Sequence, residues 1–331
     1  MQDVAARAGV SAKTVSRVFR ADPNVAPETR ARVESALKAL DYVPNMLART
    51  FREGKTSVAI VAVPDIADPF FAAIVRSIDR IAQTHAHALV IANLGDDPER
   101  EREIVEAMLN RQMDALIIAP ISADQSYLRK WQNHMPIVFI DREPRNLLAD
   151  VFIEDDRGGA KAAVAHLIAR GHRSIAFIGD ASDVDTRKRR MLGYRAAMGE
   201  AGIPVRDETV ALIAPSAAAT TVERMLGLPD APTAIFSSNS LTSIEVFPAL
   251  QSLRRADIAL VSFGDFPMAA SLTPSVTVVD QDPGRLGRAA GERLFARLAA
   301  PHRRYRRSNV FEVELITRGS TRPISTSIEG G

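Results

Sequence analysis

The segment from Ser11 to Arg17 gathers side chains that suit the major groove of DNA. Arg and Lys can donate to guanine, a small residue such as Ala can touch a thymine methyl, and hydroxyls can reach phosphates or base edges. A Gly and a Ser between two helices are common in turns and do not by themselves indicate DNA binding. The prediction depends on the whole series of residues in this order and at these spacings. The residues predicted to contact DNA here are Ser11, Ala12, Lys13, Thr14, Ser16, Arg17, Asn24 and Thr29.

A helix-turn-helix is expected to position these side chains. Residues 3–8 predict a short helix, Gly9 suits the left-handed residue that ends it, and Ser11 can cap the next helix. That second helix, 12–19, is expected to bury its apolar residues and to turn Ala12, Lys13, Ser16 and Arg17 outward. A third helix is predicted from about Pro27 to Leu40.

Positive charge is concentrated in the same part of the chain. Residues 1–57 contain ten Lys and Arg against six Asp and Glu, while the whole chain has a formal net charge of only +2. A cationic amino-terminal segment is what a phosphate-binding module requires. The basic run 302–307 is interpreted first as an exposed loop, with a second nucleic-acid patch as the alternative.

The rest of the chain alternates apolar runs with helical stretches, and it does so twice. Strands are predicted at 57–63, 87–93, 115–119 and 137–141, and again at 174–179, 210–213, 234–237 and 258–263. Helices are predicted at 70–84, 98–111, 123–133, 187–201, 217–226 and 241–252. The fold class is therefore a small all-α headpiece followed by α/β, with two doubly wound parallel-sheet subdomains and a ligand cleft between them.

Three ordered motifs identify a resemblance. They are the run Asp3-Val4-Ala5-Ala6-Arg7-Ala8-Gly9-Val10-Ser11, the run Thr14-Val15-Ser16-Arg17-Val18, and the pair Pro44-Asn45 with Leu47-Ala48-Arg49. Residues 2–57 resemble the headpiece of the lactose-repressor (LacI/GalR) family of bacterial transcription regulators, and the resemblance continues over essentially the whole chain. It implies subdomains of the periplasmic-binding-protein type and a homodimer on palindromic double-stranded operator DNA.

The resemblance also implies domain limits. The headpiece is expected at 1–45, a hinge helix and linker at 46–56, and the effector-binding and dimerisation domain at 57–331. Within that domain, the N-subdomain is expected at about 57–156 and 284–308, and the C-subdomain at about 157–280 and 309–322. The helix 284–300 and a strand 309–316 would cross between the halves. Family members usually carry a capping Thr upstream of Gln2, so the expectation is either that the native start lies a few residues before Met1 or that the first helix is slightly frayed.

In the family, a hinge helix enters the minor groove. The resemblance places Asn45, Leu47, Ala48, Phe51 and Arg52 there. Phe51 occupies the position of the usual Leu that wedges between base pairs, and an apolar Phe can do the same. Packing of Phe51 on the core domain is the alternative.

Effector contacts are implied by the same resemblance, one motif at a time. The matching residues are Asp68 and Phe71 in Asp68-Pro69-Phe70-Phe71, Arg142 after Asp141, Arg190 before Gly193-Tyr194, Asn239 after Ser238, and Asp265. Gly264 stands where sugar-responsive members usually have an acidic acceptor, so Asp265 must substitute or the ligand differs. Retaining Arg142 and Arg190 makes an anionic effector, a sugar acid or sugar phosphate, plausible beside a neutral sugar. Arg187 to Arg189 are interpreted first as a solvated helix start.

Composition excludes several other classes. The chain has no Cys, and its six His show no metal-ligand spacing, so neither a metal nor another cofactor is expected. It has no run of eighteen apolar residues and no secretory signal, which favours a cytoplasmic protein without membrane partners. Glu99 to Glu103 are interpreted as an exposed salt-bridged helix face. We expect an effector-controlled transcription regulator, a repressor and not an enzyme. The alternatives are a sugar-binding protein without specific DNA reading and, third, a nucleotide-binding α/β enzyme.

Overall fold

The computed structural model describes residues 2–19, 22–40, 58–111, 113–181 and 183–323, and not the side chain of Phe19. The chain divides into two compact units, Met1–Thr56 and Ser57–Gly331. The predicted hinge contacts Asn45, Leu47, Ala48, Phe51 and Arg52 lie outside the described residues.

The first unit contains the predicted helix-turn-helix. Its helices are α1 (Gln2–Ala8), α2 (Ala12–Phe19) and α3 (Pro27–Ala39). Gly9 has φ of +62°, as expected for the residue that ends α1. Ser11 caps α2, because its Oγ accepts from the Thr14 backbone N–H at 3.1 Å. The guanidinium of Arg32 donates to the carbonyl oxygens of Ala8 and Gly9, which ties α3 to the end of α1.

Ser16 corrects the predicted outward face of α2. It retains 8% of its exposed surface and is therefore buried, whereas Ala12 and Lys13 are exposed and Arg17 is half-buried. The Ser side chain is short and lies next to the buried Val15. Because α2 contacts both α1 and α3, these neighbouring helices are enough to bury it.

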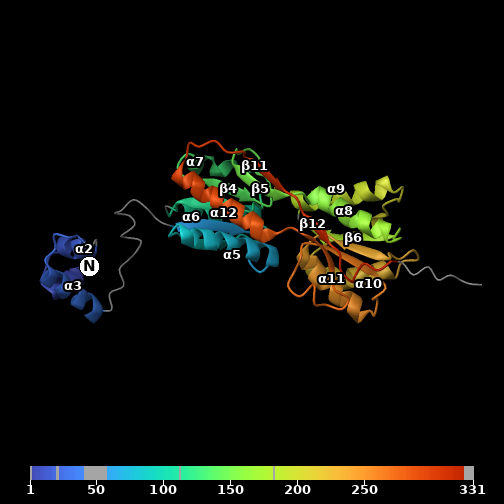
Figure 1. The fold of residues 1–331 in the computed structure, drawn as a ribbon, viewed down its shortest axis with the longest axis horizontal. Helices are drawn as coiled ribbons and strands as arrows, with labels where there is room; N and C mark the ends of the chain where they lie inside the picture. The colour runs from blue at the N-terminus through green and yellow to red at the C-terminus, as the bar shows by residue number, and fades with distance from the viewer. Residues whose placement is uncertain (1, 20–21, 41–57, 112, 182, 324–331) are drawn as a thin grey trace, which may run out of the picture. The chain divides into compact units, whose positions relative to one another are not determined.

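The second unit consists of two lobes, each built on a six-stranded sheet (Figure 1). The first sheet has the order β11-β5-β4-β3-β1-β2, and all its paired strands are parallel. Its strands are β1 (Val58–Val63), β2 (Ala88–Asn93), β3 (Ala115–Ile118), β4 (Ile137–Ile140), β5 (Asp150–Glu154) and β11 (Ser308–Phe311). Helices α5 (Pro69–Thr84) and α12 (Pro283–Ala299) pack on one face. The other face is covered by α6 (Pro98–Leu109), the 3₁₀ turn η1 (Ser126–Leu128) and α7 (Arg129–Gln132).

The second sheet repeats this arrangement with one reversal. Its order is β12-β10-β9-β8-β6-β7, and only β12 runs antiparallel to its neighbour. Its strands are β6 (Ile175–Asp180), β7 (Val210–Ile213), β8 (Ala234–Ser237), β9 (Ala259–Phe263), β10 (Thr277–Asp280) and β12 (Glu314–Ile316). Helices α8 (Asp156–Ala169) and α9 (Asp185–Glu200) cover one face. The other is covered by α10 (Ala218–Leu226) and α11 (Ser240–Ser252), and the short turns η2 (Asp207–Thr209) and η3 (Pro215–Ala217) flank β7.

Three segments connect the lobes. The chain passes from β5 of the first sheet to α8 of the second lobe, from β10 of the second sheet to α12 of the first lobe, and from β11 to β12. Parallel strands of one sheet present their carboxyl ends at one edge, so the first two crossings leave from the edges where a ligand cleft is expected.

Four elements differ from the sequence expectations. The predicted strand 309–316 is two short strands in different sheets, so the first lobe extends past residue 308 to Phe311. The predicted helix 123–133 is reduced to η1 and α7. Strands β5 and β10 had not been predicted, because β5 begins and ends with acidic residues and β10 has only two strongly apolar residues, Val278 and Val279, between Thr277 and Asp280.

Candidate effector site and DNA interface

A buried guanidinium lies between the ends of the two sheets. Arg190, on α9, is 7% exposed, and its Nε donates to Asp156 Oδ1 at 2.7 Å. Its Nη1 donates to the Ser238 carbonyl oxygen at 2.8 Å, and its guanidinium carbon lies 3.9 Å from the Phe263 ring centroid. Burial alone would lower the pKa of Arg190, yet Asp156 and Asp141 raise it. Arg190 is therefore a fixed cation in this boundary.

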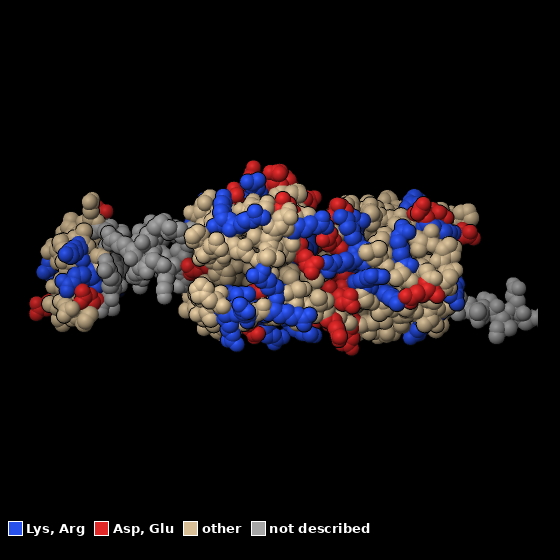
Figure 2. Space-filling model, turned by 90° about the horizontal axis from the view of Figure 1, so that it is seen from above, with Lys and Arg blue, Asp and Glu red and all other residues tan. Residues whose placement is uncertain are grey.

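Carboxylates outnumber the guanidinia at this boundary. Glu154 and Asp156 are each 1% exposed, and Asp141 is 5% exposed. Burial raises the pKa of Asp156 to about 6 against the opposing effect of Arg190. Burial, Asp141 and Asp156 together raise the pKa of Glu154 well above its usual value. Figure 2 shows acidic and basic side chains meeting along the boundary between the lobes.

Several buried polar atoms here have no hydrogen-bond partner among the described residues. They are both carboxylate oxygens of Glu154, Asp156 Oδ2, Ser238 Oγ and Gln281 Nε2. Buried polar groups in folded proteins are almost always hydrogen-bonded, and leaving one unpaired costs about 1–3 kcal/mol. Both lobes contribute such atoms to this boundary. A polar ligand bound between the lobes would supply the missing hydrogen bonds.

Arg142 is the cation of the first lobe. It follows Asp141, which ends β4 with φ of +65°, and its Nε lies 3.0 Å from Asp141 Oδ2. Its Nη1 donates to the Pro120 carbonyl oxygen at 2.9 Å. The loop that carries Pro120 is held in turn by Glu101, which is fully buried and accepts from the Ser122 backbone N–H at 3.0 Å.

Glu101 corrects the interpretation of residues 99–103 as an exposed helix face. Its second carboxylate oxygen accepts from Gln125 Nε2 at 2.8 Å and from the Tyr127 hydroxyl at 3.0 Å. The alternation of acidic and basic residues around it indicated a solvated helix. The buried loop after β3 is distant in sequence, so that pattern could not reveal it.

Polar contacts join the two lobes directly. Asp68 caps α5 by accepting from the Phe70 backbone N–H at 2.9 Å, and Ser240 of the second lobe donates to it at 3.4 Å. Burial raises the pKa of Asp68 to about 6. The segment Arg187 to Arg189 is in the first turn of α9, but the expectation that it is solvated is wrong for its arginines. The Arg187 side chain is 12% exposed, and Arg189 is half-buried and reaches Glu143 of the first lobe at 2.7 Å.

The remaining predicted effector residues are largely engaged within the protein. Phe71 is 5% exposed and belongs to the first-lobe core. Asn239 caps α11 through the Thr242 backbone N–H and donates to Asp180 Oδ2 at 2.9 Å. Both carboxylate oxygens of Asp265 accept from Arg318, at 3.0 and 2.5 Å. This pairing does not favour Asp265 as the substitute for a missing acidic acceptor.

Sequence reasoning did not single out Glu154, Asp156, Ser238 or Gln281 as site residues. Glu154 ends β5, Asp156 is the first residue of α8, Ser238 follows β8 and Gln281 follows β10. The only signal was this position after a strand, and for Glu154, Asp156 and Gln281 it required knowing that β5 and β10 are strands.

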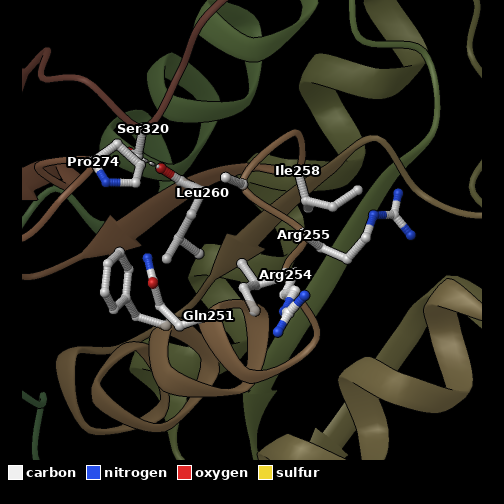
Figure 3. A pocket seen from close by; sticks show the side chains of 10 residues that line it. Gln251, Arg254, Arg255, Ile258, Leu260, Pro274 and Ser320 are labelled. Carbon is white, nitrogen blue, oxygen red and sulfur yellow. Dashed lines mark hydrogen bonds between the residues drawn. The ribbon is translucent and has the colours of Figure 1, made fainter.

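A pocket of about 280 Å³ lies elsewhere in the second lobe (Figure 3). Leu260 and Ile258, near the amino end of β9, line it together with Gln251, Arg254 and Ser320. Ser320 Oγ donates to the Leu260 carbonyl oxygen at 2.6 Å. None of the predicted effector residues lines it, so it is separate from the lobe boundary.

The headpiece presents a basic surface beside α2. Lys13 is exposed, and Arg17 donates through Nε to Asp22 Oδ2 at 2.8 Å while its side chain stays 43% exposed. Asn24 donates to Asp22 Oδ1 at 3.1 Å, and Thr29 is half-buried in the first turn of α3. Among the described helices, none is long and apolar enough to cross a membrane.

Comparisons with known proteins agree with this architecture. A family model described as bacterial regulatory proteins, lacI family, matches residues 1–45, and one described as a periplasmic binding protein-like domain matches residues 164–321. The ribose operon repressor of Escherichia coli (strain K12) is 29% identical over 327 residues, which are 97% of this chain and 99% of that protein.

Two solved structures extend the comparison. A putative ribose operon repressor from Burkholderia thailandensis is 31% identical with a TM-score of 0.70, and the match covers 80% of this chain and 100% of that one. The lac repressor dimer bound to operator and the anti-inducer ONPF is 26% identical with a TM-score of 0.78, and the match covers 97% and 98%.

A helix-turn-helix joined to a two-lobed α/β core with polar groups between its lobes defines a DNA-binding transcription regulator. The chain belongs to the lacI family of bacterial regulatory proteins, and it is a DNA-binding transcriptional repressor. Its relatives are transcriptional regulators, which confirms the prediction that it is not an enzyme.

Proposed function

We propose that the protein acts as a cytoplasmic homodimer on a palindromic operator and is controlled by a neutral polyhydroxylated effector, such as a sugar, bound between the lobes. The observation that carries the effector class is the unpaired Glu154 carboxylate, buried beside Asp156 and Asp141. Sugar hydroxyls are donors, and buried carboxylates that lack donors are the acceptors they need.

The charge of the boundary favours a neutral effector over a sugar acid or sugar phosphate. Arg190 is already paired with Asp156, and Arg142 with Asp141. Asp68 remains as an additional acid, and burial favours the uncharged form of Glu154. An anionic ligand would meet the carboxyl groups of Asp68, Asp141 and Asp156 against two guanidinia in a water-poor site, where like charges repel strongly. Arg142 and Arg190 therefore orient the carboxylates and can donate to ring or hydroxyl oxygens.

Control of DNA binding would follow from the position of this site. An effector that contacts Glu154 and Gln281 prefers the arrangement of lobes that brings both to it, and it shifts the equilibrium by that differential affinity. We propose that residues 46–56 act as the hinge that senses this arrangement. Asn45, Leu47, Ala48, Phe51 and Arg52 would enter the minor groove.

Arg17 tests the DNA side of the proposal. We expect Arg17→Ala to relax discrimination at one base pair of each half-site by about 1–3 kcal/mol, because the free guanidinium nitrogens can donate to a guanine. Sequence selection with both proteins measures this, and Lys13→Ala is the matched neighbour. Unchanged discrimination in the Arg17 variant would remove that residue from the reading surface.

The experiment for the whole proposal begins with the purified full chain and selection of genomic fragments at stated salt. The enriched fragment is then titrated in the presence of neutral sugars, the corresponding sugar acids and sugar phosphates, with calorimetry of each ligand. We expect a palindrome, and we expect one neutral sugar to bind at least tenfold more tightly than its phosphate. A sugar phosphate or acid that binds more tightly than its neutral parent would overturn the effector class. Salt-sensitive DNA binding that selects no palindrome would contradict the proposal that the protein binds a specific operator.

A further inference from the structure

The loop between α12 and β11 is a basic surface of the first lobe. Residues His302 to Arg307 include four Arg and no acidic residue. The four Arg are exposed, and within the described part of the chain Arg304, Arg306 and Arg307 form no ion pair. Unpaired arginines close together repel one another. We therefore expect this loop to bind an anion that is not part of the lobe.

The backbone of this basic loop is held firmly although its side chains are free. Arg297 donates to the Arg303 carbonyl oxygen and Arg293 to that of Arg306, each at 2.9 Å. Both arginines are anchored in turn on the buried Asp150, at 2.7 and 3.1 Å.

The loop also has an aromatic anchor. The ring centroid of Tyr305 lies 4.5 Å from the guanidinium carbon of Arg293 and 4.8 Å from that of Arg297. A loop fixed at its backbone and its central ring loses little conformational entropy when its outward arginines bind.

The basic loop lies at the same edge of the first sheet as the start of β1, the strand that follows the linker. The loop runs into the amino end of β11, and every paired strand from β11 to β1 is parallel, so the loop shares an edge with the start of β1 at Val58. Four strand spacings separate β11 from β1, about 19 Å. Figure 1 shows the end of α12 and the start of β1 at the same end of the lobe.

The linker limits how far this edge can be from DNA. Six residues separate Phe51, the proposed minor-groove wedge, from Val58, and the seven steps along the chain span at most about 25 Å when fully extended. Duplex DNA carries one negative charge per about 1.7 Å of its axis, so an edge kept this close to it faces a continuous polyanion.

We propose that the basic loop His302–Arg307 contacts backbone phosphates of the DNA flanking the hinge site, adding affinity without sequence preference. The inference rests on the proposed operator binding and adds a second phosphate-binding surface to it. Figure 2 shows that basic side chains do gather on the first lobe. His302 and Arg307 also line a surface hollow of about 520 Å³, so their side chains are open to solvent on that side.

The test compares two full-length triple variants that each lose three positive charges. One is Arg304→Gln, Arg306→Gln and Arg307→Gln. The control is Arg173→Gln, Arg224→Gln and Arg254→Gln, which changes exposed residues of the second lobe. Operator affinity is measured over a range of salt concentrations on a duplex that contains the whole palindrome, after thermal melting has shown that both variants fold.

We expect the loop variant to reduce the slope of log affinity against log salt by about one for each arginine that contacts a phosphate. The control should keep the wild-type slope. Preference for operator over a scrambled sequence should be unchanged.

Equal slopes for the two triple variants would overturn the proposal, as would a loop variant that no longer prefers operator over a scrambled sequence. An acidic protein as the true partner of the loop would give the first of these results. Failure of operator binding by the wild-type chain would instead contradict the proposed function itself, so the two failures are distinguishable.

Discussion

The two lobes share a topology but give their common boundary different chemistry. In the first lobe, β4 is followed by Asp141, which has φ of +65° and carries a carboxylate into the boundary. In the second, β9 is followed by Gly264, with φ of +93° and no side chain. The turn after the corresponding strand therefore carries a hydrogen-bond acceptor, Asp141, in the first lobe and no side chain, at Gly264, in the second.

The crossing segments differ in the same way. The first crossing buries Glu154 and Asp156, whereas the second places Gln281 next to the α12 cap Asp282. The second lobe has an acid nearby, Asp265, but Arg318 neutralises it. Acceptors therefore come mainly from the first lobe and its crossing, while the second lobe supplies an amide, a hydroxyl and Arg190. An effector with both donors and acceptors would need both lobes.

The largest expected effect is that of Arg190→Ala. Removing this guanidinium leaves Asp156 and Glu154 buried without their cation, which should lower the free energy of unfolding by about 3–5 kcal/mol and abolish the effector response. Arg142→Ala is the comparison in the first lobe, where the side chain is 14% exposed and pairs with one buried carboxylate, Asp141, so a smaller loss of about 1–3 kcal/mol is expected. Urea unfolding of both variants measures the difference. Equal losses would mean that the two lobes do not use their arginines differently.

Glu154→Gln should weaken effector binding about tenfold, because the amide replaces one acceptor oxygen with a donor and a buried polar group left unpaired costs about 1–3 kcal/mol. The unliganded protein should not lose stability, since burial already disfavours the charged form of Glu154 and Gln carries no charge. Asp265→Asn is the matched change in the second lobe and should alter affinity less than threefold. Calorimetry with the identified effector decides, and a larger effect of the Asp265 change would reverse the assignment of acceptors to the first lobe.

Asp68→Asn tests the contact between the lobes through its pH dependence. The pKa of Asp68 is raised to about 6 in the folded protein from its ordinary 3.8, so the folded state binds the proton more tightly than the unfolded state. Stability from this group is therefore present at pH below 3.8 and is lost as the pH rises to about 6. Between pH 4 and pH 7 the Asn variant, which keeps the cap acceptor, should therefore gain up to about 3 kcal/mol of stability relative to the parent protein. A difference that stays constant in urea unfolding from pH 4 to pH 7.5 would contradict this.

Gly264→Ala has the smallest expected effect. Its Cβ would lie 3.0 Å from Gln281 Oε1, and φ of +93° disfavours any L side chain, so a loss of about 1–2 kcal/mol is expected. Gly199→Ala, in α9 with open space around it, should instead raise stability by about 0.5–1 kcal/mol. Thermal melting of both variants measures this. A Gly264 variant as stable as the parent would show that a side chain fits there, and the two lobes would then differ less than proposed.

Local pattern was sufficient where the structure is local. The turn at Gly9, the Ser11 cap and the helices of the headpiece follow from contacts between residues a few positions apart, and they were predicted within one or two residues. Resemblance added Arg142 and Arg190, which the fold brings to the lobe boundary. The strand at 309–316 was expected as one piece because its apolar pattern continues across the crossing.

The amino-acid sequence by itself determined a basic helix-turn-helix followed by two α/β halves, because periodicity, capping and charge are properties of neighbouring residues. Only the tertiary structure decided which charges are paired. Arg318 and Asp265 are 53 residues apart, and Arg190 and Asp156 are 34 apart. No local pattern shows that Glu154 is buried without a donor, since its burial depends on a strand, a helix of the other lobe and two further carboxylates. The preference for a neutral effector rests on that environment, which exists only once both lobes are folded.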